Sequence, residues 1–240
     1  MSALLSVKVE DLIRRAGSAL ARGEPVLIFD APEREGETDL VFHSEMATPE
    51  LVRLARRDAG GLICCALSAE LTRRLGLPFA SDLLDVGRSA YPILGSLVDR
   101  PRYDARSAFG ISVNHRRTYT GVPDADRALT LRALGEIARD ARALSDDQLI
   151  RRFASSFVSP GHVPLIHAAP GLLRERKGHT ELSISLARMA GLSESMTVCE
   201  MLGDSGGARS PEAARRYAAV HGWIFLDGAE IREAWERWSA

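Results

Sequence analysis

The chain has 240 residues, 45% of them hydrophobic and 26% charged, which is the composition of an ordinary globular protein. Its formal net charge of -1 gives no electrostatic reason to expect nucleic acid or an anionic membrane as a partner. The cysteines number three, an odd set, and no apolar run approaches the roughly 18 residues of a membrane span. We therefore expect a cytoplasmic protein that binds neither nucleic acid nor a membrane.

Hydrophobic periodicity and turn residues predict helices and strands that alternate along the chain. Ile13, Ala16 and Leu20 recur at helical spacing, and Pro25 opens an apolar run typical of a buried strand. In the first half of the chain we expect a helix at 9–21, a strand at 25–29, a polar loop at 30–39, a strand at 40–42, a helix that Thr48 caps and that stops before Gly60, and a strand at 62–66. A loop at 85–108, a strand at 109–113, a helix at 124–139 and a helix capped by Ser145 follow. In the last part we expect a strand at 163–166, a helix at 180–190, a strand at 196–200, a helix at 211–221, a strand at 223–226 and a helix at 230–238. This alternation favours a single layered α/β domain over residues 1–240.

An acidic loop follows the first predicted strand. Five carboxylates and an arginine fall within ten residues there: Asp30, Glu33, Arg34, Glu35, Glu37 and Asp39. A solvated turn is the simplest interpretation of such a loop. Two features favour a functional site: α/β folds place their sites after buried strands, and Gly36 lets the backbone turn so that Glu35 and Glu37 can converge. A dense set of carboxylate oxygens suits Mg²⁺.

A basic turn, Arg174–Thr180, precedes an amphipathic helix. Free backbone N–H groups and the helix dipole favour an anion at such a position, and Arg176 and Lys177 would add positive charge. The hydroxyl of Thr180 would add a hydrogen bond to a phosphate. The alternative is a solvated turn in which Thr180 only caps the helix.

Two histidines, one glutamate and a cysteine pair are further candidates. His162 lies in a predicted turn, 159–163, that enters a strand, and His179 lies in the basic turn; either can carry a proton or bind a metal. Glu200 ends an apolar strand, where a carboxylate is costly without a partner or a role. Cys64 and Cys65 share a predicted strand, so one is expected in the core while the other can face the site.

These motifs together resemble a known family. In order, they are Phe29-Asp30, Arg34-Glu-Gly-Glu-Thr-Asp39, Asp58-Ala-Gly-Gly-Leu-Ile-Cys64, Thr120-Gly121 with Asp124-x-x-Arg127, Pro160-Gly-His-Val163, Arg176-Lys-Gly-His-Thr180 and Cys199-Glu200. The series is similar to 3,4-dihydroxy-2-butanone 4-phosphate synthase of riboflavin biosynthesis, in its monofunctional, archaeal-type subgroup. The resemblance implies a three-layer domain of the α/β (α+β complex) kind, with a mixed twisted sheet flanked by helices.

The resemblance also implies an activity and a set of site residues. The family is a lyase that converts D-ribulose 5-phosphate to 3,4-dihydroxy-2-butanone 4-phosphate and formate, as a homodimer with Mg²⁺ or Mn²⁺, two ions per site. The steps are a metal-stabilised enediol, dehydration, skeletal rearrangement and loss of C4. By this resemblance Glu35 and His179 bind the metal. The expected catalytic residues are His162, Glu200, Glu37, Asp30 and Cys64. The expected substrate contacts are Arg34, Glu35, Asp39, Thr120, Arg176, Lys177, Gly178, His179, Thr180 and Glu200.

The chain departs from the family pattern at five positions, Pro32, Glu33, Val158, His167 and Ser205. None of them is an expected metal ligand. An alternative is therefore a paralogue of the same fold that makes a different product from a sugar phosphate in secondary metabolism. A second alternative is a non-enzymatic module that binds a phosphate or a nucleotide.

Overall fold

The computed structural model describes the backbone of residues 2–240 and the side chains from residue 8 onward. Within this range the strands form one seven-stranded sheet in the order β4-β5-β3-β6-β2-β1-β7. The strands are β1 (Val26–Phe29), β2 (Thr38–His43), β3 (Cys64–Leu67), β4 (Phe109–His115), β5 (Phe157–His167), β6 (Ser195–Glu200) and β7 (Ile224–Asp227). The pairs β1–β7 and β3–β5 are parallel and the other neighbours are antiparallel, so the sheet is mixed.

Helices surround the sheet, and two of them begin at the capping residues predicted from the sequence. The helices are α1 (Ser2–Ala21), α2 (Pro49–Leu54), α3 (Ala69–Leu75), α4 (Ala80–Gly87), α5 (Asp124–Asp140), α6 (Asp146–Ser156), α7 (His179–Met189), α8 (Pro211–His221) and α9 (Gly228–Trp238). Thr48 caps α2, and Ser145 forms a reciprocal capping box with Gln148 at α6. Among the described residues, no helix is both long enough and apolar enough to span a bilayer.

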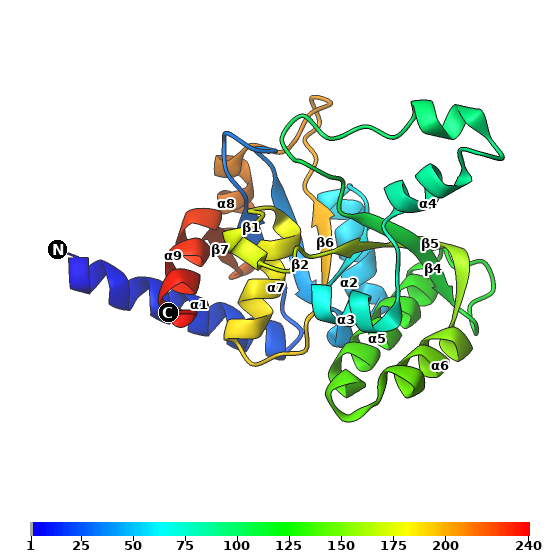
Figure 1. Cartoon of the computed structure of the whole chain (residues 1–240). Coiled ribbons are helices and arrows are strands. Elements are labelled where there is room, and N and C mark those ends of the chain that lie inside the picture. The colour runs from blue at the N-terminus through cyan, green and yellow to red at the C-terminus, as the bar shows by residue number, and fades with distance from the viewer. Residues whose placement is uncertain (1) are drawn as a thin grey trace.

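Successive strand residues face two separate cores, one on each side of the sheet. Leu27 packs with side chains from α2, α5, α6 and α8, whereas its neighbour Ile28 packs with side chains from α1, α7 and α9. Figure 1 shows α7 and α9 on one side of the sheet and α2 and α5 on the other. The fold class expected from the sequence, three layers around a mixed sheet, is therefore confirmed.

The predicted turn at 159–163 is wrong, because these residues lie inside β5. Pro160 and Gly161 look like a turn, but a register shift opposite Val113 and Asn114 of β4 accommodates them. Gly161 is needed there, since an added Cβ would lie 2.0 Å from the carbonyl carbon of Val113. His162 is therefore a strand residue, in the part of β5 that lies beside β4 and before the residues that pair with β3.

The predicted loop at 85–108 is wrong in its first half. The helix α4 reaches Gly87, and a 3-10 helix covers Pro92–Ser96. The helix α4 buries none of its side chains, and Val86 and Tyr91 are exposed. Figure 1 shows this segment standing away from the sheet before the chain returns to β4. The sequence also did not predict α3, and α1 begins at Ser2 instead of residue 9.

Strand directions bring several chain segments to one edge of the sheet. Because β2 is antiparallel to both β1 and β6, its first residues lie beside the last residues of these strands, with Asp39 opposite Glu200. The loop 30–37 that joins β1 to β2 leaves from the same edge. His179, the first residue of α7, contacts this loop. The acidic loop and the basic turn therefore meet.

We expect Phe42→Ala to lower the free energy of unfolding by about 3–5 kcal/mol, the usual cost of deleting a buried aromatic ring. Phe42 is fully buried between β2 and the helices that pack on its face. Urea denaturation measures the change. Tyr119→Ala is the control, because this ring is 99% exposed and its loss should alter stability by less than about 0.5 kcal/mol. Equal denaturation midpoints for the two variants would contradict this account of the core.

Candidate active site

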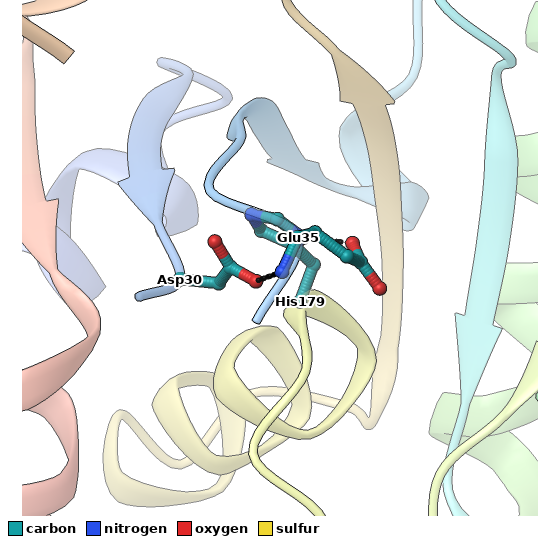
Figure 2. A group of neighbouring side chains, drawn as sticks. All are labelled: Asp30, Glu35 and His179. Carbon is teal, nitrogen blue, oxygen red and sulfur yellow. Dashed lines mark hydrogen bonds and ion pairs between the residues drawn. The ribbon is translucent and has the colours of Figure 1, made fainter. Parts of the chain in front are cut away.

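The acidic loop closes on the carboxylate of Asp30 at its start. Asp30 accepts hydrogen bonds from the backbone N–H groups of Glu35 at 3.0 Å and of Glu37 at 3.1 Å, and the first of these is drawn in Figure 2. Gly36 has a φ of 68°, which a residue without Cβ adopts at low cost. Glu35 and Glu37 both face one cleft, as the sequence predicted, whereas the buried Asp30 holds the loop in shape.

The imidazole of His179 contacts the acidic loop at three residues. Its Nδ1 is 3.2 Å from Oε2 of Glu35, and its Nε2 is 3.2 Å from the carbonyl oxygen of Glu37 and 3.6 Å from Oδ1 of Asp39. The ring is 6% exposed as a side chain, so these contacts are shielded from water. Both ring nitrogens face acceptors, and the ring therefore donates from both in the absence of a metal.

Potential metal ligands gather around this imidazole. Donor atoms of Asp30, Glu35 and His179 all lie within 4.8 Å of one another, from the loop and from α7 (Figure 2). Oδ1 of Asp39 is buried and has no hydrogen-bond partner among the described residues, an arrangement that a cation would relieve. Carboxylate oxygens with one imidazole suit Mg²⁺ or Mn²⁺. The donor set therefore fits a hard divalent ion.

The pKa values of the residues in this cluster differ from their ordinary values. Burial opposes charge on Glu35, but the hydrogen bond and charge of His179, with the charge of Arg34, lower the pKa of Glu35 to about 2. Burial likewise opposes charge on His179, but the carboxylates of Asp39, Glu35 and Asp30 raise its pKa to about 9. Burial raises the pKa of Asp39 to about 8. The metal-free centre therefore holds an imidazolium beside an ionised glutamate.

The opposite wall of the cleft comes from β6 and β3. Glu200 accepts a hydrogen bond from the backbone N–H of Leu62 at 2.7 Å. Gly61 makes room for it, because an added Cβ would lie 2.4 Å from Oε2 of Glu200. Burial and the charges of Glu35 and Glu200 raise the pKa of Glu37 across the cleft. Glu37 is therefore more readily protonated than an ordinary glutamate.

The two adjacent cysteines face opposite sides of the sheet. Cys64 lines the cleft, whereas Cys65 is fully buried in the other core, within reach of the Ser44 and Ser195 hydroxyls. Burial, followed by the charges of Glu200 and Asp39, raises the pKa of the Cys64 thiol above its usual range. Cys64 therefore faces the cleft as a neutral thiol.

The basic end of the cleft is formed by Arg34, Arg176 and the start of α7. Thr180 lines the cleft as well, and the N-cap of α7 is Gly178 rather than a hydroxyl residue. An added Cβ on Gly178 would lie 2.8 Å from two guanidinium nitrogens of Arg34, so this glycine allows Arg34 to lie against the helix end. Lys177 is exposed and lines a different hollow, beside α9.

The cleft has a volume of about 280 Å³ and contains most of the predicted site residues. Those predicted from the sequence are Arg34, Glu35, Glu37, Asp39, Cys64, Arg176, His179, Thr180 and Glu200. The lining residues that the sequence did not indicate are Pro101, Tyr103, Ser107, Ala108, Phe109, Ile166 and Val198. Four of these, Pro101, Tyr103, Ser107 and Ala108, belong to the segment 101–108, which carries no motif and was expected only to be a loop.

His162 and Thr120 lie together but outside the cleft. The backbone N–H of His162 donates to Oδ1 of Asn114 at 2.8 Å, and the amide nitrogen of Asn114 lies 3.5 Å from the carbonyl oxygen of Thr120. His162 precedes the cleft residue Ile166 by four positions along β5, a distance of about 13 Å for an extended strand. The side chains of His162 and Thr120 are exposed, so they are open to a second molecule.

We expect metal binding to release about one proton per site and to strengthen by about tenfold per pH unit between pH 6 and pH 8. With a pKa of about 9, His179 is protonated throughout that range, and a metal must displace a proton to reach its ring nitrogen. Titration calorimetry with Mn²⁺ in two buffers of different ionisation enthalpy measures the proton count. His162→Gln is the control and should keep the release. An affinity that is constant with pH would show that His179 does not bind the ion.

Comparison with known proteins identifies the family of this chain. Residues 14–234 match the family described as 3,4-dihydroxy-2-butanone 4-phosphate synthase. The proteins of that name from Methanosarcina mazei and Methanothermobacter thermautotrophicus are each 47% identical, over 95% and 93% of this chain and 92% and 96% of their own. A solved structure of such an enzyme in complex with two magnesium ions has a TM-score of 0.70 and 26% identity, over 90% of this chain and 93% of that one. The chain belongs to the 3,4-dihydroxy-2-butanone 4-phosphate synthase family.

Proposed function

We propose that this protein is a metal-dependent lyase that converts D-ribulose 5-phosphate to 3,4-dihydroxy-2-butanone 4-phosphate and formate in riboflavin biosynthesis. One observation carries the proposal beyond family membership. A single cleft has a metal-compatible group, Glu35 with His179, on one side and the anion-compatible pair Arg176 and Thr180 on another. A phosphorylated ketose has the matching chemistry, with oxygens that bind a cation at one end and a phosphate at the other.

The metal site is assigned to Glu35 and His179, with Asp30 beside them. When bound, Mg²⁺ or Mn²⁺ stabilises negative charge on a substrate oxygen and so favours enediol formation. The relative whose structure contains two magnesium ions supports two ions per site. In the metal-bound state Nε2–H of His179 can continue to donate to the carbonyl oxygen of Glu37, which orients the ring.

Proton transfer is assigned to the groups around the centre of the cleft. Glu37 has a raised pKa, so it can take up and release a proton near neutral pH more readily than an ordinary glutamate. Glu200 is held by the backbone of Leu62 on the opposite wall. Carboxylates on two walls can serve different faces of the sugar, as dehydration and rearrangement require. Cys64 supplies a neutral thiol to the same surface.

The positions at which this chain departs from the family pattern favour the standard product over the product of a diverged paralogue. Pro32, Glu33, Val158 and Ser205 are exposed, and His167 is buried at the end of β5. None of the five lines the cleft. The part of the substrate surface that one chain's own cleft supplies therefore contains none of the five departures.

We assign to this protein a homodimer in which both subunits contribute residues to each active site. His162 and Thr120 are expected at the substrate, yet in one chain they lie outside the cleft and exposed. A second copy related by twofold symmetry can bring its own His162 and Thr120 to this cleft and receive the same in return. This would explain why exposed residues on β5 and its neighbouring loop carry family motifs.

The first test follows formate release from D-ribulose 5-phosphate with Mg²⁺. We expect formate from the unaltered protein and a fall of about a hundredfold or more for Glu35→Gln, the scale seen when an electrostatic stabiliser is removed. Glu33→Gln is the matched control, because Glu33 is exposed in the same loop and should retain activity. The proposal fails if folded protein with bound metal releases no formate.

The second test mixes two inactive variants, Glu35→Gln and His162→Ala, by refolding or coexpression. If each site takes Glu35 from one subunit and His162 from the other, a mixed dimer has one intact site. Random pairing should then restore about a quarter of the normal activity, because half of the dimers are mixed and each has one working site of two. If both residues act within one chain, no activity returns.

A further inference from the structure

Asp104 does not itself line the cleft, but its carboxylate contacts Arg34 and Arg176, the two arginines at the anion-compatible end of the cleft. Its Oδ2 accepts a hydrogen bond from Nη2 of Arg34 at 2.9 Å and another from Nε of Arg176. All three side chains are shielded, with exposures of 10% to 16%. The guanidinium of Arg34 also lies over the ring of Tyr103, with 5.2 Å between the guanidinium carbon and the centroid of the ring. One carboxylate oxygen thus lies between two guanidinium groups.

The two arginines are held in place independently of Asp104. Arg176 donates from Nη1 to Glu181 at 2.8 Å, and the Glu181 side chain is fully buried in α7. Arg34 donates from Nη1 to Glu35 at 2.8 Å and lies 3.5 Å from Asp30. These partners belong to the acidic loop and to α7, whereas Asp104 comes from a segment far away in the sequence. The arginines would therefore remain at the cleft if Asp104 left it.

The segment that carries Asp104 has little to hold it. Residues 97–106 are exposed or half-buried, and α4, which precedes them, buries no side chain. The chain is fixed again at Ala108, whose carbonyl oxygen accepts from the backbone N–H of His167 at 2.8 Å. Segments with few buried contacts open at low free-energy cost. Asp104 and the ring of Tyr103 attach this segment to the arginines of the cleft, whereas Arg106 attaches it to Asp82 of α4 and to the ring of Phe79.

We propose that Asp104 is an internal competitor for the substrate phosphate: it occupies Arg34 and Arg176 in the empty site, and an incoming phosphate displaces it and releases residues 101–106. This inference rests on the proposed function for the identity of the anion. A carboxylate and a phosphate offer the same kind of acceptor oxygens to a guanidinium, and phosphate carries more charge. Asp104 would thereby set the affinity of the cleft for phosphorylated ligands and discriminate against weaker anions.

Affinity for inorganic phosphate provides the first test, measured by calorimetry at constant ionic strength. Removing an internal competitor raises the fraction of sites that can bind, so we expect Asp104→Asn to bind phosphate about tenfold more tightly. Asp99→Asn is the matched control. It removes the same charge from the mostly exposed stretch 97–106, where Asp99, among the described residues, hydrogen-bonds only to the backbone N–H of Arg100, and its affinity should equal that of the unaltered protein. Equal or weaker binding by Asp104→Asn overturns the proposal.

Limited trypsin digestion at Arg102 provides the second test, because this residue is exposed in the segment that would be released. Phosphate should speed cleavage in the unaltered protein, and chloride at the same ionic strength should not. Asp104→Asn should be cleaved quickly with or without phosphate. Protection by phosphate would show that the segment closes on the ligand and would refute displacement.

These readouts need no turnover, so they separate the two proposals. Formate release without tighter phosphate binding by Asp104→Asn refutes the competitor alone. Tighter binding without formate release refutes the proposed function alone.

Discussion

The edge of the sheet around β1, β2 and β6 depends on one positive imidazole held among carboxylates. Asp30, Glu35, Asp39 and Glu200 lie where like charges would repel, and burial, with the charges of Glu200 and Glu35, raises the pKa of Asp39. His179 contacts two of these groups and the backbone of the loop between them. The imidazolium offsets the repulsion among these carboxylates, and a divalent cation bound among them would do the same. The stability of this part of the sheet and its affinity for a metal therefore follow from one arrangement.

Strand direction places this centre within reach of the basic turn. An antiparallel β2 between β1 and β6 brings Asp39 beside Glu200, and α7 begins where the loop between β1 and β2 turns back. The metal-compatible group and the pair Arg176 and Thr180 thus lie on different sides of one cleft, and Arg34 hydrogen-bonds to Glu35 and to Asp104. Such separation of charge suits a ligand that is itself polar at both ends, as a phosphorylated ketose is.

Features that are encoded locally could be predicted from the sequence, whereas those that depend on distant contacts could not. The capping residues Thr48 and Ser145 and the turn at Gly36 act within a few positions, and each had its expected effect. The turn predicted around Pro160 was wrong because pairing with β4 imposes an extended backbone there. Asp104 carried no signal, since its partners Arg34 and Arg176 are about 70 positions away in either direction.

The opposite orientation of Cys64 and Cys65 has a consequence for chemical durability. Adjacent residues that point to opposite faces of a strand cannot bridge each other, and the sheet itself separates their sulfur atoms. The thiol that faces the cleft keeps its proton because burial and then the nearby carboxylates raise its pKa, and a protonated thiol is a poor nucleophile. Oxidants and electrophiles that enter the cleft would therefore meet an unreactive sulfur, so the centre should tolerate the presence of a cysteine beside its chemistry.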